Sequence, residues 1–268
     1  MHVVKGALLA VLALFGATWM LPQTSEVKDS GPRTYRFTVD YKSLSPVGDV
    51  VHLQHVVGDY TRGLPNGEMT WKNVTLATAV GPGAALGPAV SRAFMDGLRY
   101  RADMPAESGP MSAAFFKDFP PDAVVERNLV WDTLMFEAFG QRYFRNLKLN
   151  EPYHAMQAQD LAMPGVGTFQ NRDVELTWIG KSRRNGQDCA VIDYTALMNP
   201  LNISNAGVKM TARSHYWGQI WVALATRQVE YATLYEVVTG ELTLPGAAGP
   251  QPLSVLRTGV FEPVGSAR

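Results

Sequence analysis

The sequence predicts a mainly β protein of the α+β class, with an antiparallel curved sheet or half-barrel packed on a buried helical segment. Long stretches alternate apolar and polar residues with a period of two, which is typical of strands with one buried face. The Asn-Gly pairs at 66–67 and 185–186 stand between such stretches and favour tight hairpin turns. A run with helical spacing at about 123–144 separates two β-rich parts, and this order favours one sheet packed against a helix.

Residues 1–24 have the composition of a secretory signal peptide. Lys5 precedes an uncharged run rich in Leu and Ala, from Gly6 to Leu21, which is short for a membrane span of about 20 apolar residues. The residues Ala17–Trp19 do not form a clear small-x-small cleavage site, so an uncleaved anchor formed by residues 6–21 stays open. We therefore expect an exported protein, periplasmic or extracellular, that contacts a membrane only through this segment if it is retained.

Residues 25–268 are expected to form a single β-rich domain with a helical insertion at about 89–144. Cys189 is the only cysteine, so no intrachain disulfide stabilises the fold. Lysine and arginine number 24, as do aspartate and glutamate. This neutral balance argues against nucleic-acid binding and against broad attraction to anionic membranes.

The first β part contains three predicted strands, at 35–41, 50–60 and 68–80. Their apolar residues recur at every second position, and the turn at 65–67 joins the last two. Within the third strand the apolar parity changes between Trp71 and Val74, which predicts a β-bulge near Asn73.

The middle of the chain is predicted to be helical. After a Gly- and Pro-rich loop at 81–88, Val90, Phe94 and Leu98 recur at every fourth position and predict a short helix from about Ala89 to Tyr100. A longer helix is expected at 123–144. It is apolar on nearly all sides, which is typical of a helix that is buried against a sheet or lines a cavity.

The second β part begins with strands at 173–178 and 189–197, joined by the turn at 184–187. A meander is predicted to follow, with strands at 208–216, 220–225 and 229–238. Gly218 separates the first two of these strands, and Val229, Tyr231 and Val237 are expected to face one way. The stretch 254–261 is predicted to be a final edge strand.

No pattern in the sequence indicates a metal or cofactor site. His52 and His55 point to opposite faces of a predicted strand and therefore cannot share a metal ion. His154 is expected in a polar loop with Glu151 and Asp160. The acidic pair Glu230 and Glu236 lies about 20 Å apart along a strand, which is too far for paired-carboxylate chemistry.

The candidate catalytic group is the thiol of Cys189, with His215 as base and Asp193 to orient it. Cys189 begins an apolar strand, however, whereas reactive thiols favour partly exposed, electropositive positions. An inert buried thiol and a solvated His215 are therefore the preferred interpretation. We expect no catalytic residues and no cofactor.

Aromatic and methionine residues concentrate in the helical middle and in the strands expected to cover it. Such an interior is either a solid core or an incompletely closed one that holds an apolar molecule. In the second case the residues expected to contact the ligand are Phe94, Trp131, Met135, Phe136, Phe139, Trp178 and Trp221.

The stretches Val174–Leu197 and Val208–Val238 carry a resemblance to a known family. In particular, Gly218–Val222 leads into the strand at 229–234. In architecture these segments resemble the half-barrel lipoprotein-carrier superfamily of bacterial envelopes. The helical insertion does not map onto that family, and no functional residue is carried over.

Three functional hypotheses follow from the sequence. The first is a non-enzymatic exported protein that binds a hydrophobic or lipid-like ligand between sheet and helix. The second is a structural or protein-interaction module of the cell envelope with a solid core and an envelope protein as partner. The third is a thiol hydrolase that uses Cys189.

Overall fold

The structure is a computed structural model that describes residues 31–105, 108–110, 112–120, 122–163, 167–205 and 208–265, with only the backbone at 156–163 and 205. The signal peptide or anchor expected at residues 1–24 lies outside these ranges. Within them, no helix has both the length and the apolar character needed to cross a membrane.

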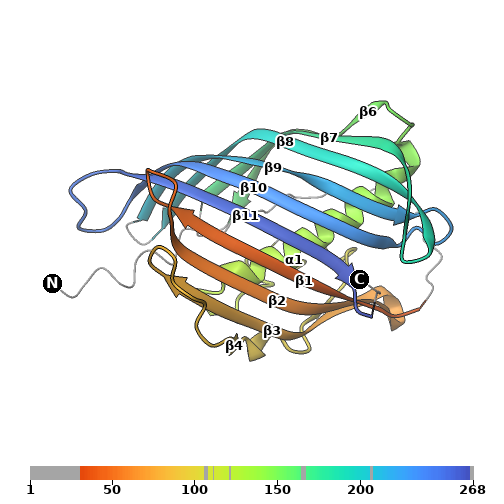
Figure 1. Cartoon of the computed structure of the whole chain (residues 1–268), viewed down its shortest axis with the longest axis horizontal. Coiled ribbons are helices and arrows are strands. Elements are labelled where there is room, and N and C mark those ends of the chain that lie inside the picture. The colour runs from red at the N-terminus through yellow and green to blue at the C-terminus, as the bar shows by residue number, and fades with distance from the viewer. Residues whose placement is uncertain are drawn as a thin grey trace.

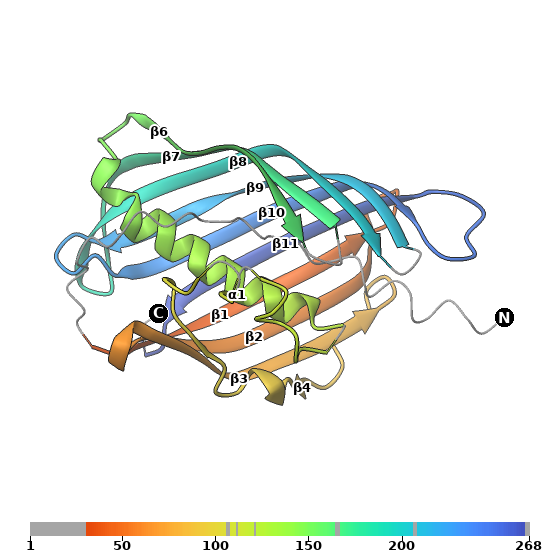
Figure 2. The ribbon, with the colours of Figure 1, turned by 180° about the vertical axis from the view of Figure 1, so that it is seen from behind.

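A single antiparallel sheet of eleven strands dominates the molecule and confirms the predicted fold class. Figures 1 and 2 show that the sheet is strongly curved and unclosed, with one helix, α1, lying across its concave face. Ten strands follow the order β4-β3-β2-β1-β11-β10-β9-β8-β7-β6, and β5 pairs with β3. The strands are β1 (Arg33–Leu44), β2 (Val50–Leu64), β3 (Glu68–Val80), β4 (Val90–Ser91), β5 (Arg99–Tyr100), β6 (Pro152–Met163), β7 (Gly167–Arg184), β8 (Gln187–Asn205), β9 (Val208–Ala223), β10 (Val229–Thr243) and β11 (Gln251–Pro263).

The first three strands form as the alternation predicts. The inward-facing residues Tyr35, Phe37, Val39 and Tyr41 of β1 are fully buried. A short turn, η2 (Pro65–Gly67), links β2 to β3, with positive φ angles of 65° at Asn66 and 70° at Gly67. The predicted bulge is confirmed at Asn73, which has a φ of 54° and lies where the register between β2 and β3 shifts.

The last strand is not at an edge, and that prediction is wrong. β11 lies in the middle of the sheet, where it pairs with β1 on one side and with β10 on the other (Figure 1). β1 has a hairpin partner only in β2, so its second edge would otherwise leave backbone groups unpaired. The described edges of the main sheet are formed instead by β4 and β6.

The predicted break at Gly218 is also wrong, because β9 continues through it. A Cβ atom at this position would lie 2.1 Å from the Thr233 carbonyl oxygen, so glycine permits close approach of β10 instead of ending the strand. In β10 a register shift between Val229 and Tyr231 places Val229 on the concave face, where Leu234 and Glu236 are also buried. Tyr231 and Val237 point outward together, so the prediction that all three residues face one way is wrong only for Val229.

The short helix predicted from Ala89 to Tyr100 does not form. The segment contains β4, a 3-10 turn η3 (Ala93–Met95) and β5, which run along the edge of β3. The Arg92 N–H donates to the Val74 carbonyl at 2.7 Å, and the Gly97 N–H donates to the Trp71 carbonyl at 2.9 Å. These bonds to an open strand edge replace the bonds that a helix would make within itself.

The longer helix, expected at 123–144, is confirmed. It consists of α1 (Val124–Glu137), a π-helical turn η4 (Ala138–Arg142) and a 3-10 turn η5 (Phe144–Asn146). Gly140 lies against the sheet, where a Cβ atom would be 3.2 Å or less from the side chains of Val222 and Ile220. The helix is not apolar on all sides, however, because its buried residues include Glu126, Asn128, Asp132 and Thr133.

Candidate functional site

The concave face of the sheet carries an aromatic core beneath α1. The Phe136 ring lies 5.7 Å from Phe37 and 5.6 Å from Phe261, and the Phe139 ring lies 5.3 Å from Tyr194. All five of these side chains are at least 99% buried. Because strand residues alternate in direction, this aromatic content follows directly from the two-residue period of the sequence.

A second aromatic group packs outside α1, and we call it the aromatic cover. Its rings meet edge to face at centroid distances between 4.8 and 5.6 Å. The Trp131 indole N–H donates to the Pro110 carbonyl at 2.7 Å, which ties the helix to this loop segment. The aromatic cover consists of Phe94, Tyr100, Phe115, Phe116, Phe119 and Trp131.

Six of the seven side chains expected to contact a ligand lie in the core or pack against it, at different points along the helical segment. Met135, Phe136 and Phe139 lie on the buried side of the helical segment, whereas Phe94 and Trp131 belong to the cover and are partly exposed. The Trp178 ring lies 5.6 Å from Phe144, just beyond the helix. Their role in binding stays a prediction.

The remaining expected residue, Trp221, lies on the convex face. It alternates with Ile220 and Val222, which contact the helical segment at Gly140, so its own side chain points away from the helix. It packs instead against Tyr231 at a centroid distance of 5.2 Å. The same alternation places Trp217 on the convex face.

A buried charge cluster links α1 to the centre of the sheet, and no pattern in the sequence predicted it. Arg257 of β11 is 2% exposed and forms ion pairs with Asp132 of α1 and, at 3.2 Å, with Glu236 of β10. Ser214 donates a hydrogen bond of 2.9 Å to Glu236. The Arg257 guanidinium also lies 5.0 Å from the centre of the Tyr41 ring.

This cluster contains one cation and two carboxyl groups. Arg257 can balance the charge of one carboxylate, and full ionisation of both would leave a net negative charge in the interior. Burial raises the pKa of Glu236 well above its ordinary value, although the hydrogen bond from Ser214 opposes this. Burial therefore stabilises the protonated form of Glu236 relative to that of an exposed glutamate, beside the Arg257–Asp132 ion pair.

Two further acidic residues attach the helical segment at its ends. Glu137 accepts a 2.7 Å hydrogen bond from the Tyr60 hydroxyl and pairs with Arg62 at 3.0 Å. Glu126, at the other end of α1, forms an ion pair with Arg92, next to the aromatic cover. Burial raises the pKa of Glu126. The helix is thus fixed to the sheet by three polar anchors as well as by apolar packing.

The residues of the hydrolase hypothesis lie apart. Cys189 is fully buried, and burial raises the pKa of its thiol to about 11. Cys189 of β8 is paired with Ala223 of β9, and Ala223 lies eight positions along β9 from His215. His215 accepts a hydrogen bond from the Met198 N–H at 3.3 Å, and Asp193 is paired with Gln219. This geometry gives no thiol–imidazole pair.

The other histidines show no metal-binding arrangement. His52 is buried on the concave face, whereas His55 contacts Asp40 at 2.7 Å on the convex face, as the strand period predicted. His154 lies in β6, not in the predicted loop, and contacts Asp173 at 2.9 Å. Across the described residues, no group of three or more His, Cys, Asp or Glu could hold a metal ion.

Comparisons with known proteins identify no relative by sequence. No family model matches the chain, and a search of curated proteins finds no match. A solved structure described as "Lipid-protein interactions in lipovitellin" is similar at 15% identity and a TM-score of 0.44, over 91% of this chain and 26% of that one. The chain therefore spans about a quarter of the length of that structure.

An acetoacetate decarboxylase-like enzyme from Sphingomonas wittichii RW1 is similar at 11% identity and a TM-score of 0.11, over 94% of this chain and all of that one. Neither likeness carries an argument about function.

Proposed function

We propose that the protein binds a hydrophobic or lipid-like ligand on the concave face of its sheet, beneath the helical segment and the aromatic cover, without catalysing a reaction. The observation that carries this proposal is the form of the interior. An open, curved sheet presents a broad face of apolar and aromatic side chains, and one helix with a loop segment covers it (Figure 2). Predominantly apolar walls with a few polar groups are typical of sites for such ligands.

The cover supports the proposal because several of its aromatic side chains are not fully buried. Phe94, Phe115, Phe119 and Trp131 are only partly buried, although they pack on the core. Displacement of this cover would join its apolar side chains to those of the concave face. A flexible acyl chain fits that surface, because it can follow an aromatic wall without needing polar partners.

The proposal also places the protein outside the cytosol, in the periplasm or the extracellular space. This part depends on the basic residue and apolar run at the N-terminus. An exported carrier of apolar molecules is consistent with three hydrophobic features of the chain: the apolar run at residues 6–21, the core beneath α1 and the aromatic cover.

Ligand content can be tested directly on the purified full-length chain. We expect organic extracts to contain a lipid in stoichiometric amount, and an environment-sensitive apolar dye to bind the stripped protein. Trp131→Ala should weaken dye binding about tenfold or more, because it removes a large aromatic surface. Trp217→Ala is the matched control on the convex face and should leave binding unchanged. Extracts without lipid, together with absence of dye binding, would exclude this function.

The alternative is a structural or interaction module of the cell envelope. The direct contacts of Phe136 with Phe37 and Phe261 favour it, because a solid interior leaves no room for a ligand at that point. In that case ligand-free protein should retain an envelope partner in pull-down experiments, and Trp131→Ala should lower stability without affecting any dye.

A further inference from the structure

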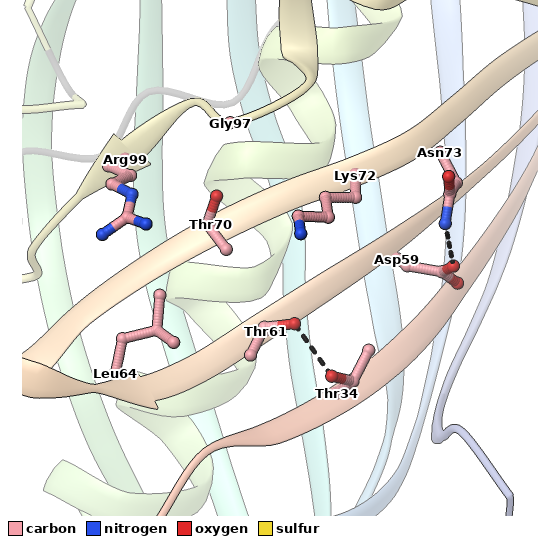
Figure 3. Close-up of a pocket in the computed structure, with 9 residues that line it drawn as sticks. All are labelled: Thr34, Asp59, Thr61, Leu64, Thr70, Lys72, Asn73, Gly97 and Arg99. Carbon is pink, nitrogen blue, oxygen red and sulfur yellow. Dashed lines mark hydrogen bonds between the residues drawn. The ribbon is translucent and has the colours of Figure 1, made fainter.

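A hollow of about 300 Å³ lies on the convex face of the sheet, opposite to the face that carries α1, over β1, β2 and β3 beside β5 (Figure 3). Thr34, Thr61 and Thr70 occupy facing positions on three successive strands. They alternate with inward-facing residues such as Tyr35 and Trp71, so their side chains are on the convex face. The hollow is therefore separate from the concave face, and its volume is at the lower end of the range for small-molecule sites.

The charged residues that line this hollow, Lys72, Arg99 and Asp59, include two cations and one carboxylate. Figure 3 shows Lys72 and Arg99 extending beside the threonines. Arg99 pairs with Glu68 at 3.0 Å, whereas no ion pair of Lys72 is found among the described residues. Asp59 also lines the hollow, but Arg36 balances its charge at 3.0 Å. Lys72 is thus the uncompensated charge.

Asp59 is occupied by hydrogen bonds as well. Its two carboxylate oxygens accept bonds from Arg36, and one of them also accepts a 2.9 Å bond from the Asn73 amide. Figure 3 shows the Asn73 bond. The carboxylate is therefore directed to these partners, which reduces its repulsion of an anion beside Lys72.

The hydroxyl of Thr70 is a second, independent indication that a ligand binds in this hollow. Thr70 is 6% exposed, and its oxygen atom is buried with no hydrogen-bond partner within the described part of the chain. A buried hydroxyl without a partner is unfavourable, because it has lost its hydrogen bonds to water. Thr34 and Thr61 bond to each other at 2.8 Å, and only one hydroxyl proton is used in that bond, so the other is available.

We propose that this hollow binds a phosphate-type oxyanion, either free or as part of a larger molecule. Lys72 supplies the charge, and the hydroxyls of Thr70 and of the Thr34–Thr61 pair supply donors to the oxygen atoms. Charged hydrogen bonds of this kind are the strong ones in proteins. The volume accommodates a phosphate with a small organic group, so the source is either a soluble phosphate ester or a lipid headgroup. The proposal does not depend on the apolar ligand of the concave face.

Calorimetric titration at low salt tests the site, with inorganic phosphate and glycerol 3-phosphate as probes. Lys72→Met keeps the aliphatic stem and should weaken binding about tenfold or more, because it removes the uncompensated charge. Lys42→Met is the matched control, since Lys42 lies on the same face of β1 but outside the hollow. It should bind the probes as the unchanged protein does.

Thr70→Val separates binding from folding. Valine has the shape of threonine without its unpaired hydroxyl, so we expect unchanged or higher stability together with weaker phosphate binding. Vesicles containing phosphatidylglycerol, compared with pure phosphatidylcholine, distinguish the source. Retention on the anionic vesicles that Lys72→Met abolishes would identify a lipid headgroup, whereas binding of glycerol 3-phosphate alone would identify a soluble ester. Binding that neither Lys72→Met nor Thr70→Val reduces, or no binding of any probe, would overturn the proposal.

Discussion

Arg257 places a fixed positive charge at the centre of the concave face, where the sequence pattern favours apolar residues. Its inward direction can be predicted from the sequence, because Val255, Arg257 and Phe261 share one parity of β11. Its partners cannot be, since Asp132 and Glu236 come from a helix and another strand. Parity predicts which face a residue occupies, but the contacts across that face depend on strand order and on the position of the helix.

Cys189 should be inert in the folded protein. Its thiol is fully buried and has a pKa of about 11, against an ordinary value of 9.0, so about a hundredfold less thiolate is present at mildly alkaline pH. We expect iodoacetamide at pH ~8 to leave Cys189 unmodified, whereas the denatured chain is alkylated fully. Mass spectrometry of both samples measures this. Rapid modification of the native protein would contradict the inert interpretation.

Among the elements, the strands of the sheet could be predicted more accurately than the segment that runs along the edge of β3. The strands β1 to β3 and the hairpin between β7 and β8 follow from alternation and Asn-Gly turns, which are local signals. The prediction of a helix at 89–100 failed because the helical spacing of Val90, Phe94 and Leu98 is a coincidence. The backbone of this segment forms hydrogen bonds with β3 instead. Likewise, nothing local to β11 indicates that β1 needs a partner.

The close approach of β9 and β10 at Gly218 can be tested by substitution. Gly218→Ala should destabilise the protein by about 3 kcal/mol, because the new methyl group meets the Thr233 carbonyl oxygen of the neighbouring strand. Gly180→Ala is the matched control in β7, where a Cβ atom meets nothing within 4 Å. It should leave stability unchanged or raise it slightly. Urea unfolding of both variants gives the comparison, and equal stabilities would refute this account of Gly218.

The stability of the whole molecule should depend on pH through Glu236. Its pKa is raised in the folded state by burial, beside Arg257, Asp132 and Tyr41. As pH rises past the ordinary value of 4.5, the unfolded chain releases this proton first while the folded chain retains it. The free energy of unfolding therefore decreases with rising pH, by roughly 1 kcal/mol per pH unit, until the folded pKa is passed.

Glu236→Gln should remove this contribution, because an amide does not ionise. Urea unfolding between about pH 5 and pH 8 should then show a flatter dependence than in the unchanged protein. Glu241→Gln is a suitable control, since Glu241 lies on the same strand, β10, but is exposed at the surface. Identical pH profiles for Glu236→Gln and the unchanged protein would show that Glu236 is ionised in the folded state throughout.

The central position of β11 also affects how the molecule is made. Tyr35 is paired with Pro263, so a strand synthesised early must wait for one synthesised late. On the ribosome, the β-rich regions before and after the helical segment therefore each have an exposed edge until β11 emerges and joins them. Contacts between such distant parts of a chain slow folding and leave nascent edges open to aggregation. A chaperone that protects β1 during synthesis would be of direct benefit to this protein.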